Sequence, residues 1–502
     1  MAKAPRASAP VEPARPAPQT AAPADLATSW RIVFALLAVL AVLVLWFPLA
    51  RVPALYSINY NEGFNTQFAH EAISGVRLYA APPQFVYTTY PPISFYVVGA
   101  VGTLFGNINM AGRWIALLGY FAVALLAGMI VERMTGQRRY AVYAAACFLI
   151  WIAAFKPDRV GMNDPQFLGM TLSMAGLYAY VRAPGEAKWL RWSAALFVVA
   201  LFTKHSLMAL PLAVAIQLFL TNKKRLGTWL IAGAAVGFGL LFVTVLVGGS
   251  YFLTDLLLPR IHSWDLLQAN VAFYLMFFQM PLTATLVWAL GLPDLRPSSL
   301  AVWVVAAGNV IGFIFCCAGG SDWNHLFDAI LGLALVAGLL LPAAEKAVQA
   351  LAWREGVFTV LLAVPFFFAA WILVPQRMSD DLAALRLIPQ LEREFAQGAG
   401  FLRGQPGAAL CENLLMCYSA GKPMTYDNFA VEQLVKTGTI PEQRLLKMLD
   451  AHEYPTIEID IAGYEPLQPA ARQGFSAAFM GELLAQYRPV MRTSSFAVFV
   501  AK

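Results

Sequence analysis

Uncharged, apolar runs recur along most of the chain, and they restrict its fold more than any other feature. A helix needs about 20 apolar residues to cross the hydrocarbon core of a membrane. Two shorter pieces, 192–203 and 205–222, flank Lys204, and nine longer runs approach the required length: 32–50, 114–131, 140–155, 165–181, 226–254, 266–293, 297–321, 329–344 and 356–376. We therefore expect a mainly α-helical, polytopic membrane protein with about 11 transmembrane helices.

The balance of apolar and charged residues supports this class. Apolar residues make up 59% of the chain and charged residues 13%, against roughly 25% charged in a soluble protein. This balance excludes an ordinary soluble enzyme, a disordered scaffold and a small secreted module held by disulfides. The net charge of +6 is then explained by basic cytoplasmic loops, and no nucleic-acid partner is expected.

One apolar stretch, 78–112, contains four prolines, so only about 92–106 can form a helix. This piece is too short to cross, and we expect a re-entrant or juxtamembrane helix. If it does not cross, the basic loops all fall on the side of the N-terminal tail: 132–139, 182–191, 221–227, 294–296 and 345–354. By the positive-inside rule that side is the cytoplasm. We expect a multi-pass protein of a bacterial inner membrane with a cytoplasmic N-terminus.

Both ends of the chain differ from its apolar middle. Residues 1–29 hold 6 Pro and 10 Ala, a composition that cannot bury enough surface to fold, and they predict a disordered cytoplasmic tail. Residues 376–502 carry 12 basic and 14 acidic side chains, which is typical of a soluble domain. Helical and strand-like apolar patterns both occur there. We expect a small α/β domain in the periplasm, after a transmembrane domain that spans 30–375.

Two carboxylates stand where outer segments meet membrane helices. Glu62 lies in the first periplasmic segment, 51–112, and Asp164 lies just before the run that begins at 165. Low-dielectric surroundings raise the pKa of a carboxyl group and a neighbouring cation lowers it, so such a location can tune a general base. Glu62 could also be a solvated loop residue, and Asp164 could cap the helix that follows. We expect both to face one outer cavity.

Ionisable and polar residues gather in the other outer loops. Lys204 and His205 interrupt an apolar stretch, and an ionisable residue at membrane depth indicates a functional site, although a lysine there can also snorkel to the interface. The remaining candidates for substrate binding are Arg159, Arg260, His262, Asn324, His325 and Tyr90. Asp322 and Asp328 lie near the last of these histidines, and such a cluster could bind a divalent metal. Beyond such a metal, the sequence indicates no cofactor.

Two of the five cysteines, Cys411 and Cys417, lie in the predicted periplasmic domain. A disulfide needs Cα atoms within about 7 Å. A continuous helix would hold two residues at this spacing too far apart, so a disulfide between them requires a turn.

The order of several motifs resembles that of the GT-C glycosyltransferases. The chain has a carboxylate soon after the first membrane helix, a Tyr-Pro-Pro sequence before a helix, an arginine at the start of the next, and a second carboxylate in the next outer loop (Glu62, Tyr90–Pro92, Arg113 and Asp164). The protein O-mannosyltransferases and the lipid A aminoarabinose transferases share this order. The resemblance covers roughly residues 30–375. Many relatives carry Asp-Glu at the first site, where this chain has Asn61-Glu62.

This resemblance implies a hexosyl- or pentosyltransferase. It would move one sugar from a polyprenyl-phosphate carrier to a lipid, glycan or protein acceptor outside the membrane, with inversion at the anomeric carbon. Either Glu62 or Asp164 would act as the base. The leaving phosphate would be neutralised by Lys204, with His205, Arg260 or Arg159.

Two other classes of protein fit parts of the pattern. A transporter or flippase of a lipid-linked glycan would suit many crossings and an intramembrane lysine, but transporters often contain internal repeats and none is visible in this sequence. A glycan polymerase or ligase would use a lipid-diphosphate donor on the same outer face. The location of Glu62 and Asp164 around one cavity would favour the transferase over the transporter.

Overall fold

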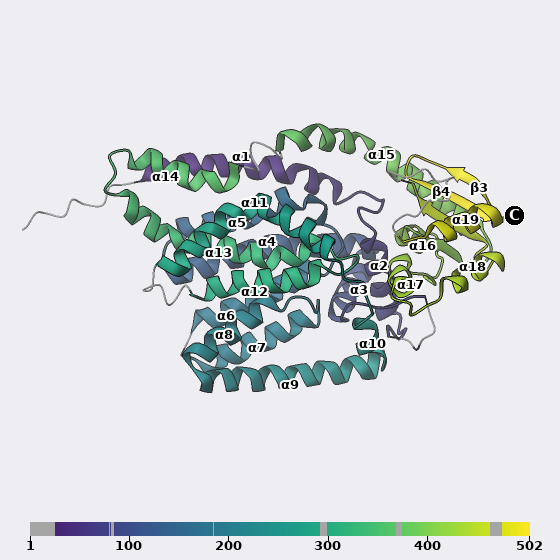
Figure 1. The fold of residues 1–502 in the computed structure, drawn as a ribbon, viewed down its shortest axis with the longest axis horizontal. Coiled ribbons are helices and arrows are strands. Elements are labelled where there is room, and N and C mark those ends of the chain that lie inside the picture. Colours follow the sequence, from purple (N-terminus) through teal and green to yellow (C-terminus); the bar gives the residue numbers. More distant parts are fainter. Residues whose placement is uncertain are drawn as a thin grey trace, which may run out of the picture.

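The computed structural model describes residues 26–79, 81, 85–183, 185–291, 299–367, 374–461 and 474–502. It has two parts, a long bundle of helices and a small domain at one end of it (Figure 1). The fold is mainly helical, as the sequence predicts. The predicted N-terminal tail lies almost entirely outside the described residues, and the first helix begins at Ala27.

Each of the 11 predicted crossings is represented by a separate helix. Six of these helices are long and apolar enough to cross a membrane by their length and composition. The 11 helices are α1 (Ala27–Arg51), α4 (Ile108–Thr135), α5 (Arg138–Phe155), α6 (Gln166–Arg182), α7 (Ala187–Leu201), α8 (Ala209–Thr221), α9 (Lys223–Gly248), α11 (Trp264–Gly291), α12 (Ser299–Cys316), α13 (Phe327–Val348) and α14 (Arg354–Ala363). The runs 192–203 and 205–222 thus form two helices, because the chain turns around Lys204 between α7 and α8.

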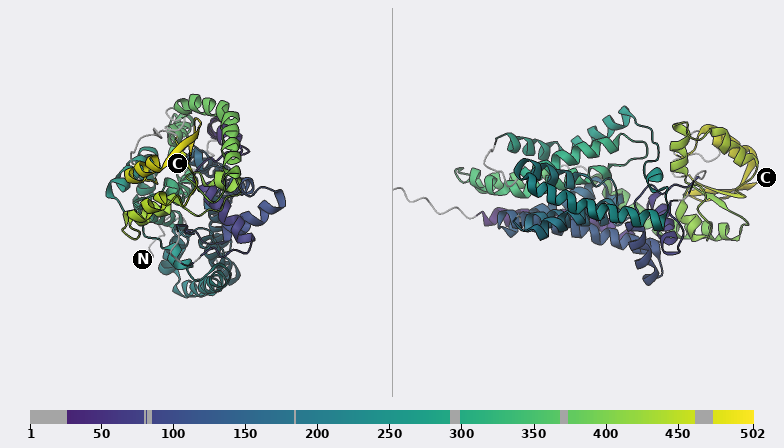
Figure 2. Two further views of the ribbon diagram at one scale, coloured as in Figure 1. Left: turned by 90° about the vertical axis from the view of Figure 1, so that its right-hand side faces the viewer. Right: turned by 90° about the horizontal axis from the view of Figure 1, so that it is seen from below.

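Polar contacts show which helix ends lie together. At one end, Glu345 accepts hydrogen bonds from the indole of Trp30 and from Arg139, and Arg133 donates to the carbonyl of Arg182. The start of α1 and three of the predicted cytoplasmic loops therefore meet at this end. The C-terminal domain lies at the other end of the bundle (Figure 2). The alternation of loops that the basic residues predict agrees with this arrangement.

Two short helices lie at the domain end of the bundle. They are α2 (Asn61–Ile73) and α3 (Ile93–Phe105), each of 13 residues. At 1.5 Å per residue such a helix spans about 20 Å, and the apolar helix α3 is shorter than the six candidate membrane spans. Helix α2 touches the C-terminal domain closely at Gly63, where a Cβ atom would come within 2.2 Å of the backbone nitrogen of Leu415. This glycine brings the residues beside it against the domain.

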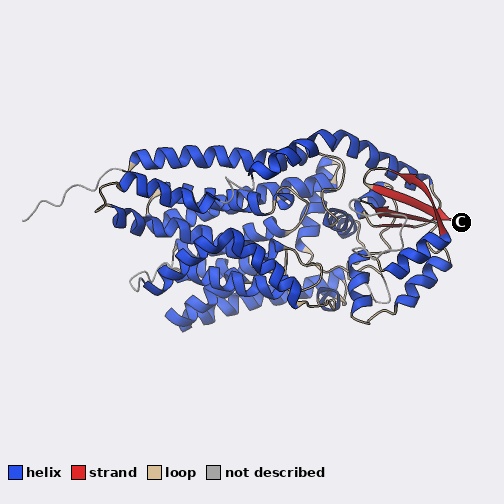
Figure 3. Ribbon diagram, turned by 45° about the horizontal axis from the view of Figure 1, so that its top comes forward, coloured by secondary structure: helices blue, strands red, loops and turns tan. Residues whose placement is uncertain are grey.

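The C-terminal domain is built on a four-stranded sheet, and Figure 3 shows that the strands lie at that end of the molecule. The strand order is β1-β2-β4-β3, with β1 parallel to β2 and the other pairs antiparallel. Helix α15 (Val374–Gly404) leads into the domain. Its other elements are β1 (Ala409–Cys411), α16 (Leu414–Ser419), α17 (Asn428–Lys436), α18 (Glu442–Asp450), β2 (Thr456–Asp460), α19 (Ala477–Gln486), β3 (Tyr487–Arg492) and β4 (Phe496–Ala501).

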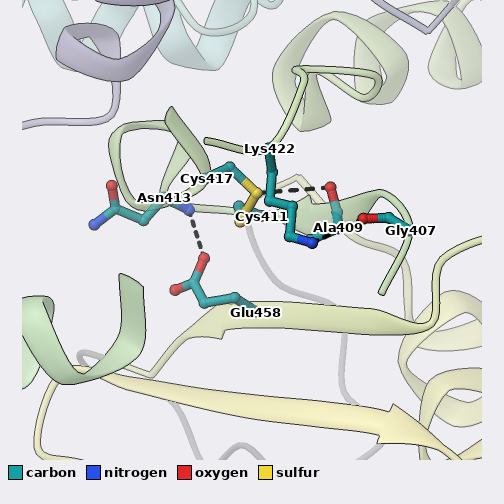
Figure 4. The surroundings of a disulfide bond; sticks show 7 residues. All are labelled: Gly407, Ala409, Cys411, Asn413, Cys417, Lys422 and Glu458. Carbon is teal, nitrogen blue, oxygen red and sulfur yellow. Dashed lines mark hydrogen bonds between the residues drawn. A yellow bond between two sulfur atoms is a disulfide. The ribbon is translucent and has the colours of Figure 1, made fainter. Parts of the chain in front are cut away.

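Cys411 and Cys417 form a disulfide with a Cα–Cα distance of 5.9 Å (Figure 4). The turn that the spacing requires lies between the end of β1 and the start of α16. The loop within it is fixed to the sheet, because the backbone N–H of Asn413 donates to Glu458 at 2.9 Å. Beside it, the Lys422 amine donates to the carbonyls of Gln405 and Gly407.

Candidate functional site

A cavity of about 1090 Å³ lies where the bundle meets the C-terminal domain. The bundle contributes the start of α2, the segment before α3, the loop before α6, the turn between α7 and α8, and the loops before α11 and after α12. The domain contributes the start of α17, the loop after β1 and the end of β2. Seven of the eight residues predicted to bind substrate line the cavity: Tyr90, Arg159, His205, Arg260, His262, Asn324 and His325. The sequence therefore identifies most of this wall, although the seven residues come from five separate segments.

Glu62 does not line the cavity but lies behind its wall, fully buried. Arg113, which is also fully buried, donates from Nε to Oε1 at 2.7 Å and from Nη2 to Oε2 at 2.6 Å. The backbone N–H groups of Ile58 and Asn163 also donate to this carboxylate. The remaining N–H groups of Arg113 donate to three backbone carbonyls between α1 and α2. The bonds of Arg113 hold the first outer segment against α4, and the Asn163 N–H joins this segment to the loop before α6.

Asp164 also lies behind the cavity wall, and it is held by two cations. The Lys204 amine donates to Oδ1 at 3.0 Å, and the Arg159 guanidinium donates to Oδ2 at 3.3 Å. Oδ1 also accepts the backbone N–H of Gln166, the first residue of α6, so Asp164 binds the start of this helix as well as the cations, although the N-cap residue is Pro165. The pKa of this carboxyl is lowered: burial acts to raise it, and Lys204 and Arg159 outweigh burial.

The two predicted bases are neighbours but do not face each other across open space. Asn163 joins them, because its backbone N–H donates to Glu62 at 3.1 Å and the next residue is Asp164. The predicted cavity exists, but neither carboxylate is among the residues that line it. Lys204 is likewise 1% exposed and does not snorkel, because Asp164 binds its amine.

Arg159 connects this buried pair to the cavity. Its guanidinium forms a short ion pair with Asp322, which also pairs with Lys156 at 3.2 Å. These two cations outweigh the effect of burial and lower the pKa of Asp322 to about 2. Asp322 is thus engaged with cations rather than available to a metal. Within the described ranges, no group of three or more His, Cys, Asp or Glu residues could hold a metal ion.

Aromatic rings surround the polar part of the cavity. The Lys204 amine lies 5.2 Å from the ring centre of Tyr90. The rings of His205 and His325 both contact Phe315, at centroid distances of 5.9 and 4.9 Å. Neither of these histidines has a hydrogen-bond partner at Nδ1 in the described part of the chain. Buried nitrogen atoms without partners can bind polar groups of a ligand.

Arg260 differs from the other buried cations. Its guanidinium lies 5.4 Å from the ring centre of Phe429, on the C-terminal domain. Among the described residues it forms no ion pair, whereas Arg113, Arg159 and Lys204 are each bound to a carboxylate. Burial lowers the pKa of Arg260, as expected for a cation without a counter-ion. An arginine of this kind is suited to bind an anion such as a phosphate.

Asp427, on the C-terminal domain, lines the cavity and was not singled out from the sequence. It caps α17, and its Oδ1 accepts the backbone N–H groups of Phe429 and Ala430 and a short hydrogen bond from the Tyr60 hydroxyl. Burial raises the pKa of this carboxyl to about 6. An aspartate before a short helix reads as an ordinary cap. Its hydroxyl partner Tyr60 lies 367 positions away, and no local sequence pattern indicates this pairing.

Comparison with solved structures identifies proteins with a similar fold. The structure of ArnT from Cupriavidus metallidurans in the apo state matches with a TM-score of 0.58 and 14% identity, over 95% of this chain and 98% of that one. The structure of the same protein bound to undecaprenyl phosphate matches with a TM-score of 0.55 and 14% identity, over 94% and 98%. The chain has the GT-C fold.

A second membrane glycosyltransferase of this fold also matches. The oligosaccharyltransferase of Archaeoglobus fulgidus, in its apo form, gives a TM-score of 0.54 and 12% identity over 92% of this chain and 73% of that one. No family model and no curated protein sequence matches the chain. The GT-C resemblance read from the sequence is confirmed at the level of the fold, and the roles of individual residues are proposals.

Proposed function

We propose that this protein is an integral membrane glycosyltransferase that moves a single sugar from a polyprenyl-phosphate carrier to a lipid, glycan or protein acceptor. The observation that carries the proposal is the cavity at the domain end of the bundle, lined by Arg260 without a counter-ion. The GT-C fold supports it, and one structure with this fold contains undecaprenyl phosphate. The kind of sugar, hexose or pentose, follows from neither observation.

The chemistry needs a stabilised leaving group. When the bond from the anomeric carbon to the phosphate oxygen breaks, negative charge develops on the carrier phosphate, and a preorganised cation lowers the barrier. We assign this role to Arg260, with Arg159 near the same surface. His205, His262, His325, Asn324 and Tyr90 would form polar contacts with the phosphate or the sugar. Lys204 would act mainly through Asp164, to which it is bound at 3.0 Å.

A base role for Glu62 or Asp164 stays a prediction. To accept a proton, either would first have to give up a cation that it holds at 2.6 to 3.3 Å. We therefore propose positioning roles for both. Glu62 would fix Arg113 and the first outer segment, and Asp164 would fix Lys204 and Arg159 behind the cavity.

The side of the membrane on which the reaction occurs is also part of the proposal. The basic ends of the bundle would be cytoplasmic by the positive-inside rule, so the cavity and the C-terminal domain would lie in the periplasm. A disulfide between Cys411 and Cys417 is consistent with an oxidising compartment. The acceptor would then be a component of the cell envelope.

The proposal is tested by sugar transfer in detergent. Purified wild-type protein would be incubated with a panel of labelled polyprenyl-phosphate monosaccharides and a crude extract of envelope lipids and glycans. Arg260→Gln should lower the transfer rate at least 10-fold and weaken the binding of undecaprenyl phosphate, whereas Arg488→Gln, on the exposed surface of β3, should change neither. Folded wild-type protein that transfers no sugar from any donor would contradict the proposal and favour a transporter.

A further inference from the structure

Three bundle carboxylates that the sequence singles out near the cavity are each bound to a cation. Glu62 and Asp164 lie behind the wall in ion pairs, and Asp322 lines it but is bound to Arg159 and Lys156. On the domain side, Glu432, Glu412 and Asp460 also line the cavity. Glu432 is paired with Lys436 at 2.6 Å, Glu412 accepts the backbone N–H of Asp460, and neither Glu412 nor Asp460 is without a partner. A transfer to a hydroxyl acceptor needs a group that can accept its proton.

Asp427 has the surroundings that such a group needs. It forms no ion pair with any described residue, and all three of its hydrogen-bond donors reach the same oxygen, Oδ1. Its other oxygen, Oδ2, accepts no hydrogen bond from the described residues and is not among the fully buried atoms without a partner. Asp427 is only 1% exposed, but unlike Lys204 it is one of the residues that line the cavity. Oδ1 is thus used for positioning, and Oδ2 is available to a ligand in the cavity.

The three bonds at Oδ1 also fix Asp427 relative to the bundle. Two come from the start of α17 and one from Tyr60, at the N-terminus of α2. The next residue along, Asn61, lines the same cavity. The contact of Gly63 with Leu415 holds α2 against the domain one turn further on. The carboxylate is therefore held rigidly at the junction between the two parts of the molecule.

We propose that Asp427 is the general base of the transferase, supplied to the active site by the C-terminal domain; this inference rests on the proposed function. Oδ2 accepts the proton of the acceptor hydroxyl while the acceptor oxygen bonds to the anomeric carbon. The bond between that carbon and the phosphate oxygen breaks, and its electron pair leaves with the carrier phosphate beside Arg260. The proton then passes from Asp427 to solvent. No oxidant or further reactant is needed.

The charges around Asp427 agree with this role. Burial raises its pKa to about 6, while the Tyr60 hydroxyl, the two backbone N–H groups and the charge of Arg260 oppose that rise. Tyr426, the preceding residue, is a further titratable neighbour, and its pKa is raised by burial, by Tyr454 and by Asp427. A base acts best when its pKa lies near the working pH. Asp427 would be ionised above about pH 6 and protonated below it.

The decisive variant is Asp427→Asn, because its amide oxygen can keep the three hydrogen bonds at Oδ1 while Oδ2 becomes a non-basic NH2 group. The matched control is Asp450→Asn, an exposed carboxylate of the same domain. With the donor panel and envelope extract described above, we expect kcat to fall about 100-fold or more in Asp427→Asn. The binding of undecaprenyl phosphate should stay within threefold of wild type, and the control should match wild type throughout.

The pH profile separates a base from a merely structural group. In wild type, kcat/KM should rise with pH through about 6, and the residual activity of Asp427→Asn should lack this rise. Tyr60→Phe provides a second variant: it removes a donor that favours the ionised form, so the midpoint should move to higher pH.

Different experimental results would overturn the role of Asp427 and the proposed function. If wild type transfers sugar and Asp427→Asn transfers it within threefold of wild type, Asp427 is not the base and the proposed function stands. If Asp427→Asn does not fold, an unchanged pH midpoint in Tyr60→Phe overturns the inference. If folded wild type transfers nothing, the proposed function fails and the inference fails with it.

Discussion

The ion pair between Glu62 and Arg113 gives the sharpest test of the roles assigned to the buried carboxylates. Both side chains are fully buried, and two hydrogen bonds of 2.7 and 2.6 Å join them. Glu62→Gln would leave the Arg113 guanidinium buried without a counter-ion. Removing one partner of such a pair typically costs about 3–5 kcal/mol, so we expect the free energy of unfolding to fall by about that amount.

A double-mutant cycle isolates the interaction from other effects of each change. Arg113→Gln alone leaves Glu62 unpaired and should also be strongly destabilising. The double variant removes both charges, so its loss should be smaller than the sum of the two single losses by about 2 kcal/mol, within the range for residues in direct contact. The free energies would be measured by unfolding in mixed micelles of dodecyl maltoside and SDS, with sugar transfer measured on the same samples.

The result separates a positioning role from a base role. If Glu62 positions Arg113, the loss of transfer in Glu62→Gln should be accompanied by the loss of stability, and the double variant should recover part of both. If Glu62→Gln abolishes transfer while the free energy of unfolding changes by less than about 1 kcal/mol, the reasoning is refuted. Glu62 would then be the base that the sequence suggested.

Three further predictions concern separate features of the structure. Lys204→Met should weaken carrier binding indirectly and lower the free energy of unfolding by about 3 kcal/mol, because Asp164 loses the nearer of its two cations; equal stability in thermal unfolding would contradict this. Asp427→Asn should stabilise the protein at pH 8 but not at pH 4. Since the pKa of Asp427 is raised to about 6 in the folded state, the free energy of unfolding of the wild type falls by up to about 3 kcal/mol as pH rises from about 4 to about 6. An equal shift in Tm at pH 4 and at pH 8 would refute this prediction. Replacing Cys411 and Cys417 together by Ser should cost about 2 kcal/mol, the value expected for so short a loop, and should lower the denaturant midpoint of the C-terminal domain; an unchanged midpoint would argue against the disulfide in solution.

Much of the fold could be predicted from the sequence because the membrane makes a simple physical demand. A run of apolar residues must become a helix to satisfy its backbone groups in lipid, so the positions of the 11 helices follow from hydropathy alone. The charge at Lys204, between the runs 192–203 and 205–222, marks the break between α7 and α8. The alternation of basic loops then placed the polar residues at a single end of the bundle.

The details of the site depend on pairings that no local pattern encodes. Arg113 was noted as part of a motif, but its pairing with Glu62 joins residues 51 positions apart. Lys204 and Asp164 were both candidates, yet their mutual ion pair, which removes each from the cavity surface, depends on how α6 packs beside the turn after α7. Asp427 was missed because its partner Tyr60 belongs to the other part of the molecule. Hydropathy thus predicts the positions of the helices, whereas tertiary contacts determine which charged side chains form ion pairs.

The central claim is that this protein transfers a single sugar from a polyprenyl monophosphate. The most direct measurement is a single-turnover reaction in which the transferred label and the released carrier are quantified together by mass spectrometry. We expect one molecule of free polyprenyl phosphate for each sugar transferred, with the anomeric configuration inverted in the product. Release of a polyprenyl diphosphate, or recovery of the intact sugar-linked carrier from a folded protein that binds it, would contradict the claim.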